Sequence, residues 1–475
     1  MKKIIILFGA TLSYFAFSQG ENNNWYFGNK AGVTFNTTPP TALTDSEMNT
    51  LEAVSTISDS NGNLLFYTNG QTIRNRQHLT MTNGSGLYGY PTTHQTIILP
   101  KPGSSTLYYV FTMGFANGTT NPIAYSVVDM NLGLIGVNGQ PLGAVSNIKN
   151  EEIFNEYGLP FGHVSEAVTA VEHSDNESYW ILIPNGEQLY SFKLDNEGFH
   201  NDNPVTSNLN FSDIFENYGH IRISPKLPAE LNLDYTHFVS FTRWNTYLLE
   251  FDLYVRGFNN STGVLSNLYS LNAVGDENYS TEFNSDGTLL YAARQKDHKV
   301  IVLDLFTSTP TNMTRVVYNG VLHERGGSLQ RAIDDNIYYS INDTQYLAKI
   351  ENSNSFDFSF IEFESIDLEG ELCRYGLPPL IPILNGYNIC SDFLTLSSEE
   401  DLNFNIYKAS NIITTISNYT VTNSQDITLN AGNAIYMFPN THLENGSIFR
   451  ATIEGCSSPE YKAKSIINKT NRFIC

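Results

Sequence analysis

Six short runs of aromatic and aliphatic residues recur along the chain at broadly regular spacing. They begin at Leu64, Leu107, Tyr179, His237, Leu289 and Ile337. Several follow a polar strand and a turn that combines Asp or Asn with Gly. A period of roughly 40–60 residues with about four short strands per repeat is typical of the blades of a β-propeller. Since one blade cannot bury both faces of its sheet, the repeats must stack around an axis.

Residue usage supports an all-β fold. The chain holds 28 Tyr and 29 Phe, which favour strands, and no segment has the pattern of a four-turn helix. The six runs predict six blades, and the N-terminal hairpin at residues 25–35 can complete a seventh with strands that precede Asn385. We therefore predict a six- or seven-bladed β-propeller. A pair of β-sandwiches is the main alternative, which the regular spacing through residues 58–350 disfavours.

A second unit is expected after the proline-rich segment 378–382. Residues 426–437 and 447–453 alternate between apolar and polar types, as strands do. We predict a propeller at residues 19–385 and a small, disulfide-stabilised β domain at residues 386–475. The chain has four cysteines, which are Cys373, Cys390, Cys456 and Cys475. They allow three pairings, and the sequence does not choose among them.

The N-terminus predicts export. Lys2 and Lys3 precede a short apolar run and the small residues Ala16 and Ser18, which is the pattern of a signal peptide cleaved after Ser18. We expect a signal peptide at residues 1–18, no transmembrane segment, and an extracellular or outer-membrane surface location, with the periplasm as the alternative. The net charge of −22 argues against nucleic acid and anionic lipid as partners, because both recruit clustered Lys and Arg.

Two loops resemble ligand-binding motifs, and a structural explanation is preferred for each. Residues 84–89 match G-x-G-x-x-G, but Pro91 and a strand follow where a dinucleotide site needs a helix. Residues 59–63 resemble the start of a Ca²⁺ loop without its later bidentate Glu, so we predict a hairpin turn. No cofactor and no metal site are predicted, although Ca²⁺ binding is left open.

Clusters of acids and imidazoles are candidates for catalytic or metal sites. The densest consists of His163, Glu166, Glu172 and His173. Such residues can bind Zn²⁺, but residues 164–171 are expected to form a strand on which His163 and Glu166 point to opposite faces. Polar strand ends are therefore predicted there. The acids at 151–152 and 399–401 are expected in solvated loops, and no carboxylate pair is predicted to be catalytic.

Large aromatic and basic side chains give two further sets of candidates. Trp25, Trp180 and Trp244 could stack on sugar rings, but packing between blades is preferred. Arg243, Arg294 and Arg331 lie in or beside blade strands and are the basic residues to inspect at an axial site. The sequence has no G-x-S-x-G, H-E-x-x-H or Walker A motif. The catalytic residues therefore stay unknown, and the sequence leans toward a protein that is not an enzyme.

Several segments together resemble a known family, the WD40-like β-propeller proteins exported by Bacteroidota. The segments are 24–28, 61–70, 83–89, 95–100 and 108–112. In that family the propeller usually precedes immunoglobulin-like repeats and a gliding-motility-associated or type IX sorting domain. The resemblance covers about residues 21–385 and implies a surface role, but it brings no established catalytic residue.

A second resemblance concerns the C-terminal region. Residues 427–432 and 444–453 are similar to the short coat-hanger β-roll modules of Bacteroidota surface proteins. The chain has no immunoglobulin-like repeats, and residues 462–475 do not look like a full sorting domain. Because the chain differs from the family in these two respects, the periplasm stays an alternative location to the cell surface.

Two functions follow from these features. The favoured hypothesis is an exported binding or adhesion protein whose propeller loops contact a protein or glycan. The alternative is a hydrolase or lyase that acts on extracellular polysaccharide or peptide at the propeller axis, because a fold alone does not exclude chemistry. Converging His, Arg and carboxylate groups on the axis would favour the enzyme, whereas an axis lined by apolar and amide groups would exclude it.

Overall fold

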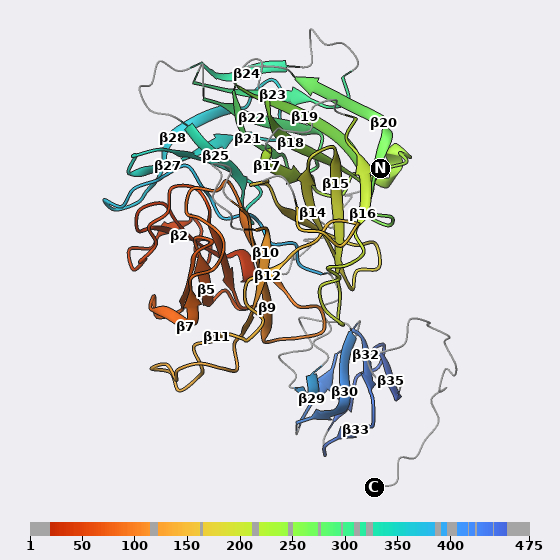
Figure 1. Cartoon of the computed structure of the whole chain (residues 1–475). Coiled ribbons are helices and arrows are strands. Elements are labelled where there is room, and N and C mark those ends of the chain that lie inside the picture. Colours follow the sequence, from red (N-terminus) through yellow and green to blue (C-terminus); the bar gives the residue numbers. More distant parts are fainter. Residues whose placement is uncertain are drawn as a thin grey trace, which may run out of the picture. The chain divides into compact units, whose positions relative to one another are not determined.

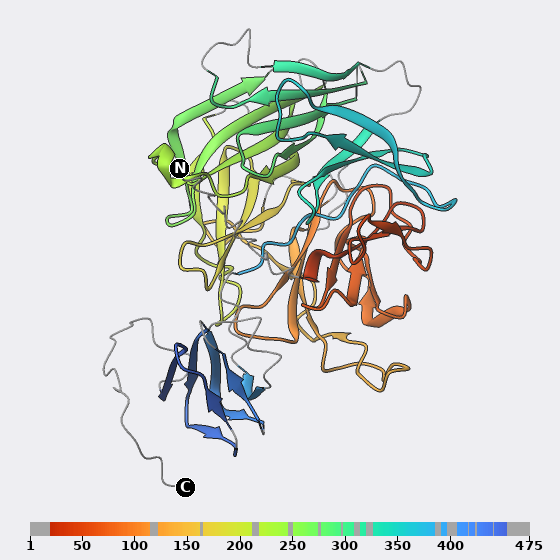
Figure 2. The ribbon, with the colours of Figure 1, turned by 180° about the vertical axis from the view of Figure 1, so that it is seen from behind.

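The computed structural model divides into two compact units, residues 1–102 with 106–385 and residues 103–105 with 386–475. We call them the propeller unit and the C-terminal unit, and we describe each by itself (Figures 1 and 2). The described residues are 20–114, 122–161, 165–210, 218–245, 250–273, 277–295, 298–307, 314–319, 326–384, 391–396, 406–416, 418–422, 425–439 and 441–453.

The first half of the propeller unit holds three sheets of mostly antiparallel strands. The first contains β1 (Asn24–Phe27), β2 (Ala31–Thr34) and β3 (Thr41–Ala42). The second contains β4 (Ser55–Ser58), β5 (Leu64–Thr68), β6 (Thr72–Asn75), β7 (Thr80–Ser85), β8 (Thr96–Pro100), β9 (Leu107–Thr112), β10 (Ala124–Asp129), β11 (Ala144–Val145) and β12 (Glu151–Glu152). The third contains β13 (Thr169–Glu172), β14 (Tyr179–Asn185), β15 (Gln188–Leu194) and β16 (Val205–Asn208).

Three four-stranded antiparallel sheets follow in chain order. The fourth contains β17 (Tyr218–Ile223), β18 (His237–Asn245), β19 (Glu250–Asn259) and β20 (Val264–Ala273). The fifth contains β21 (Asn278–Phe283), β22 (Leu289–Arg294), β23 (Lys299–Asp304) and β24 (Thr314–Asn319). The sixth contains β25 (Gly326–Arg331), β26 (Ile337–Ile341), β27 (Tyr346–Glu351) and β28 (Phe360–Asp367). The helices assigned among the described residues are two short 3₁₀ turns, Gly20–Asn22 and Ala229–Leu231.

The six predicted aromatic runs form the second strands β5, β9, β14, β18, β22 and β26, so this part of the sequence prediction is confirmed. Their side chains are mostly buried, because a strand covered on both faces needs apolar residues at successive positions. Local turn chemistry sets the hairpin that leads into β5. One carboxylate oxygen of Asp59 accepts the backbone N–H groups of Asn61 and Asn63, each at 2.9 Å.

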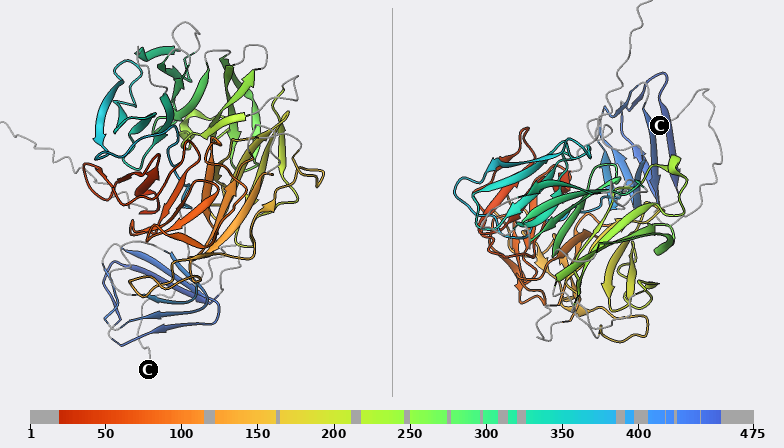
Figure 3. Two further views of the ribbon diagram at one scale, coloured as in Figure 1. Left: turned by 60° about the vertical axis from the view of Figure 1, so that its left-hand side comes forward. Right: turned by 90° about the horizontal axis from the view of Figure 1, so that it is seen from above.

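The sheets of the propeller unit follow one another in chain order around a common centre (Figure 3, left). First strands lie against first strands in the pairs β1 and β4, β4 and β8, β13 and β17, β17 and β21, and β21 and β25. Apolar cores fill the spaces between neighbouring sheets, as in the cluster shared by β17–β20 and β21–β24. Radial packing of meander sheets on their first strands defines a β-propeller.

The two ends of the propeller unit meet. Trp25 of β1 packs edge-on against Tyr338 of β26, with 5.8 Å between the ring centroids. The side chain of Asn22 donates to the carbonyl of Ile381 at 2.9 Å and accepts its N–H at 2.8 Å. The N-terminal hairpin therefore forms as predicted, but residues 372–384, here called the closing segment, join it through bridges and side chains and form no strand.

The C-terminal unit is a stack of parallel strands. It contains β29 (Ser391–Leu396), β30 (Ile406–Thr415), β31 (Thr420–Val421), β32 (Asp426–Ala431), β33 (Ala434–Met437), β34 (His442–Leu443) and β35 (Ile448–Ile453). Ile406 pairs with Thr428, and Thr428 pairs with Arg450. The register thus advances by the same number of residues from β30 to β32 and from β32 to β35, whereas a register shift interrupts the pairing of β29 with β30. Buried side chains such as Ile427 and Leu429 form the core between layers.

Two further expectations bear on the described residues. Cys373 lies in the propeller unit as a buried free thiol, and Cys390, Cys456 and Cys475 lie outside the described residues. The predicted disulfides therefore stay a prediction. Within the described ranges, no helix has both the length and the apolar character needed to cross a membrane.

Candidate functional site

A polar cluster forms where three successive first strands begin. Glu52 lies just before β4, His94 just before β8, and Glu166 just before β13. Backbone hydrogen bonds fix two of the segments that lead into these strands. The N–H of Glu52 donates to the carbonyl of Pro91 at 2.8 Å, and the N–H of Glu166 donates to the carbonyl of Tyr218 at 2.9 Å. The propeller thereby brings together residues from separate repeats, and we call this group the axial cluster.

The three side chains of the axial cluster are close enough to act together. One ligating atom from each lies within 4.8 Å of the other two. Nε2 of His94 is 4.0 Å from a carboxylate oxygen of Glu52, and a carboxylate oxygen of Glu166 accepts the backbone N–H of His94 at 3.1 Å. The hydroxyl of Tyr279, from β21, is hydrogen-bonded to Glu52. Aromatic rings shield the group, with Tyr279 and His94 centred 4.8 Å apart.

Burial controls the charge of the axial cluster. Burial, together with the negative charge of Glu166, raises the pKa of Glu52 to about 8, against the opposing effect of the hydrogen bond with Tyr279. Burial lowers the pKa of His94 to about 4. At neutral pH the imidazole is therefore neutral and Glu52 is largely protonated. A largely protonated carboxyl and a neutral imidazole in one site can act as an acid and a base.

A second polar group lies farther along the first strands. Arg222 of β17 is buried beside Glu282 of β21, with 3.4 Å between Nε and the carboxylate. Another guanidinium nitrogen lies 3.2 Å from Nε2 of His220. Burial lowers the pKa of Arg222, an effect that the charge of Glu282 opposes. His220 is 2% exposed, and its Nδ1 has no hydrogen-bond partner among the described residues.

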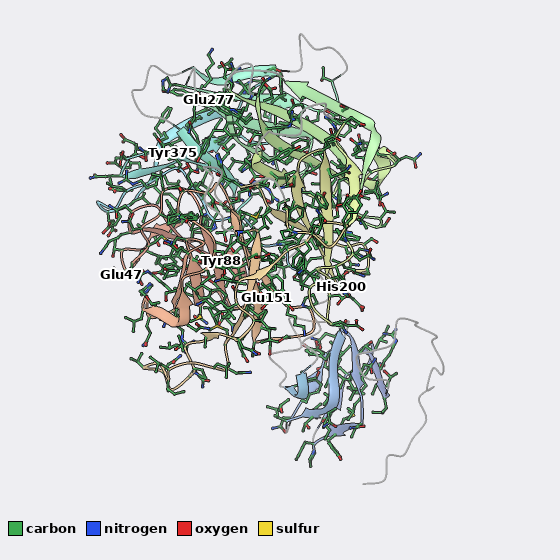
Figure 4. All side chains as sticks on the ribbon, in the orientation of Figure 1. Glu47, Tyr88, Glu151, His200, Glu277 and Tyr375 are labelled. Carbon is green, nitrogen blue, oxygen red and sulfur yellow. The ribbon has the colours of Figure 1, made fainter. Side chains whose placement is uncertain are left out.

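The closing segment borders the space between these groups. A cavity of about 10 Å³ is lined by His94, Gln95, His220 and Arg222, and also by Leu377 and Pro379 of the closing segment. A cavity of this size holds roughly one water molecule. At Gly376 a side chain would overlap the carbonyl oxygen of Glu52, so only glycine lets the closing segment run this close to the cluster. Tyr375, labelled in Figure 4, donates its backbone N–H to the carbonyl of Leu51 at 2.9 Å.

The cluster that the sequence singled out is not brought together. His163 lies outside the described residues, and β13 begins only at Thr169, later than predicted. Glu166 precedes this strand, whereas Glu172 ends it and His173 follows, paired with Asp175 at 2.9 Å. Among the described members of that predicted cluster, Glu166 is thus the one that joins the axial cluster, with partners from other blades.

The other carboxylate candidates give mixed results. Glu151 and Glu152 form the short strand β12, which pairs with β10, so the prediction of a loop there was wrong. Residues 399–401 lie outside the described residues. Residues 59–63 form the predicted hairpin turn. Residues 84–89 leave β7 and lead into turns without a helix in the described stretch that follows.

The tryptophan and arginine candidates lie mainly in packed surroundings. Trp25 and Trp180 are buried, which agrees with packing between blades, and Trp244 is half-buried against Phe251. Arg243 is buried in β18, opposite Asp252 in the strand register. Arg331 pairs with the exposed Asp335 at 3.2 Å, and Arg294 ends β22.

Sequence reasoning missed most of the axial cluster. Glu52 and His94 belong to no local motif, because each stands alone in its own repeat. His220 and Arg222 share β17, but two polar residues in one strand form no recognised motif either. A usable signal was their position. Glu52, His94 and Glu166 all come two or three residues before a first strand, so an alignment of the blades by their polar strands would have placed them at the same end of the axis.

A second notable surface is a hairpin between β10 and β11, residues 130–143, here called the apolar hairpin. It stands out from the propeller unit beside β11 (Figures 1 and 2). Leu134, Ile135 and Val137 are 68%, 66% and 95% exposed. Backbone bonds order it, since Leu142 N–H donates to the carbonyl of Leu134 at 2.8 Å. Arg76 also anchors it, by donating to the carbonyl of Gln140 at 2.9 Å.

Comparisons with known proteins leave the family open. No protein-family model and no curated protein matches the chain. Solved structures do match. A candidate 6-phosphogluconolactonase from Bacteroides fragilis has a TM-score of 0.39 and 11% identity over 76% of this chain and 98% of that one. A protein from Lactobacillus plantarum has a TM-score of 0.42 and 9% identity over 76% and 97%. At these TM-scores and identities, we infer nothing about fold or function from either structure.

Proposed function

We propose that the chain is an exported binding protein whose propeller holds a protein partner through the apolar hairpin. The observation that carries this proposal is an ordered hairpin with a solvent-exposed aliphatic tip. Exposed apolar groups gathered at one place on a folded protein mark interaction sites, because water contact with them is unfavourable until a partner covers them. Backbone bonds and Arg76 hold the tip in place, so little conformational entropy is lost on binding.

The chemistry of the tip favours a protein over a glycan. Leu134, Ile135 and Val137 are aliphatic, whereas sugar rings are usually held by the flat faces of aromatic side chains. The net charge of −22 disfavours nucleic acid and anionic lipid. The proposed partner is therefore a protein with an apolar recess.

The number of blades and the cellular location are part of the same proposal. We infer seven blades, because β4–β7 and β8–β11 are linked by one parallel bridge, Thr82 to Ala144, and so count as two blades beside β1–β3 and the last four sheets. We also propose export through the signal peptide at residues 1–18 to the cell surface, with the periplasm as the alternative. The resemblance to exported propeller proteins of Bacteroidota supports this location.

An enzyme is the second candidate, and the axial cluster favours it. Carboxylates, imidazoles and an arginine converge near the axis, which is the arrangement expected of a hydrolase or lyase. The small volume of the adjoining cavity argues against an enzyme. The cavity lined by His94 and His220 holds roughly one water molecule, whereas small-molecule sites span about 300–1,000 Å³. Binding of a protein through the apolar hairpin is therefore the favoured function.

The test places a photo-crosslinking amino acid at Val137 of the full chain in the source cells. A discrete adduct with one cellular protein is expected, and that protein is then purified and titrated against the chain. The triple variant Leu134→Ser, Ile135→Ser, Val137→Ser should raise Kd at least about tenfold, because three apolar contacts are lost. The matched control is Phe358, 76% exposed elsewhere on the propeller unit. A crosslinker there should give no such adduct, and Phe358→Ser should leave Kd unchanged.

Two results would overturn this proposal. The first is an adduct at Val137 that forms only with residues 386–475 of the same chain, since the hairpin would then be covered internally. The second is turnover of a polysaccharide or peptide panel that is lost in Glu166→Gln while the triple variant stays fully active, which would select the enzyme.

A further inference from the structure

We propose that Glu52, His94 and Glu166 form a binding site for one divalent transition-metal ion, with Zn²⁺ as the expected ion. The proposal is independent of the apolar hairpin. It rests on the distances within the axial cluster, on its surroundings, and on a second buried imidazole at the adjoining cavity.

The distances suit a metal sphere. Zn²⁺ lies about 2.0–2.2 Å from imidazole nitrogen and carboxylate oxygen, so neighbouring ligand atoms in a tetrahedral site are roughly 3.4 Å apart. The three ligand atoms of the cluster lie within 4.8 Å of one another. Small side-chain rotations of the two glutamates therefore close the site without movement of the strands.

The surroundings place carboxyl oxygens and an imidazole nitrogen, both metal-ligand types, in a largely buried site. Two glutamates approach each other in a largely buried place, with side chains of Glu52 and His94 only 15% and 11% exposed and Glu166 7% exposed. The described partners of Glu52 are an imidazole and the phenol of Tyr279 rather than Lys or Arg. A dication that takes the place of a proton stabilises carboxylates in a buried place, and the imidazole favours a transition metal over Ca²⁺ or Mg²⁺.

A buried polar atom points to an additional ligand beside the cluster. Nδ1 of His220 has no hydrogen-bond partner among the described residues, although the side chain is 2% exposed. His220 and His94 line the same cavity, which has room for roughly one water molecule. A metal-bound water there would satisfy His220 and complete the coordination that three protein ligands leave open.

Neighbouring groups already orient the ligands. The backbone N–H of His94 holds one oxygen of Glu166 at 3.1 Å, and Tyr279 is hydrogen-bonded to Glu52. Gln95 accepts the N–H groups of Val168 and Ile221 at 3.2 and 2.9 Å, which ties the strand after His94 to the next two blades in chain order. Such outer contacts fix ligand geometry and raise metal affinity. The metal would thus join three successive blades at the axis.

The test measures metal on the purified full chain by mass spectrometry and titrates the chelated protein with Zn²⁺. About one Zn²⁺ per chain is expected for the wild type, with a higher melting temperature when Zn²⁺ is restored. Glu166→Gln and His94→Asn should bind at least about tenfold more weakly. His173→Asn is the matched control, because His173 is also paired with a carboxylate, Asp175, outside the axial cluster. It should bind as the wild type does.

X-ray absorption on the Zn²⁺-loaded wild type keeps the test decisive if a variant fails to fold. Nitrogen and oxygen scatterers alone are expected. Sulfur scatterers would assign the ion to cysteines and overturn the proposal. Less than about a tenth of an ion per chain with no shift in melting, equal affinity in Glu166→Gln, or binding of Ca²⁺ in place of Zn²⁺ would do the same. The triple variant of the apolar hairpin should bind Zn²⁺ as the wild type does. The metal site can therefore be tested independently of partner binding through the hairpin.

Discussion

Buried histidines link single residues of the propeller unit to its response to acid. Burial lowers the pKa of His237 from 6.5 to about 3, helped by the positive charge of Lys226. As pH falls below 6.5, the unfolded chain takes up a proton at this residue before the folded chain does. The folded state therefore loses stability between pH 6.5 and 3, and the full contribution of the neutral imidazole is present only above pH 6.5.

We predict that His237→Gln flattens the acid dependence of stability. The wild type should lose about 2 kcal/mol more than the variant between pH 7 and pH 5, from the unfolded-state protonation of one histidine. Denaturant unfolding of the full chain at pH 7, 6 and 5 measures this difference. His442→Gln, an exposed histidine of the C-terminal unit, should keep the wild-type slope. Parallel pH dependences for wild type and His237→Gln would contradict the assignment.

Single residues also show where sequence prediction ends. The turn at Asp59 and the burial of Trp25 could be predicted, because both depend on neighbours in sequence or on residue type alone. The contact of Glu166 with His94 spans 72 positions. Its formation depends on the curvature of whole sheets, which no local pattern encodes.

At the scale of elements, the two units use different devices to bury strands. In the propeller unit, mostly antiparallel meanders pack face to face, and their aromatic second strands were predictable from composition and spacing. In the C-terminal unit, parallel strands stack in layers, with constant register through β30, β32 and β35. Alternation at residues 426–437 correctly predicted strands. It could not reveal the break at Gly432 and Asn433 between β32 and β33, or the parallel pairing, because alternation is the same in both sheet types.

We predict that Leu429→Ala loosens the C-terminal unit alone. Leu429 is fully buried between the layers, and the loss of such a side chain costs about 2–5 kcal/mol. Hydrogen exchange on the full chain should accelerate in β30, β32 and β35, while β14 and β22 stay protected because their cores are separate. Tyr436→Ala, 55% exposed on β33, should leave exchange unchanged. Equal acceleration in both units would show that they share one cooperative core.

At the scale of the molecule, stability of the propeller unit depends on how its ends join. The first sheet packs against the sixth through Trp25 and Tyr338, and Asn22 holds the closing segment at Ile381. The sequence indicated that a seventh sheet would need both ends. It did not indicate that an asparagine side chain would make the connection, since two hydrogen bonds leave no periodic signal.

We predict that Asn22→Ala destabilises the whole propeller unit by about 2–3 kcal/mol, because a buried N–H and a buried carbonyl of Ile381 lose their partner. Thermal and denaturant unfolding followed by tryptophan fluorescence measure the change. Asn61→Ala, at an exposed turn position, should stay within about 0.5 kcal/mol of the wild type. A shift confined to Asn61→Ala, or none in either variant, would argue against this contact as the closure.

The contact between Asn22 and Ile381 joins residues 359 positions apart, and this separation dictates when the propeller can be finished. A chain that is synthesised from its N-terminus exposes β1 long before the closing segment exists. Until then, the apolar face of β1 lacks the cover that Tyr338 of β26 and the closing segment supply, and it is open to contact with other chains. Completion is a late, long-range step and is expected to be slow. The layers of the C-terminal unit need only their neighbours in sequence, so this unit can fold as soon as its own strands have emerged.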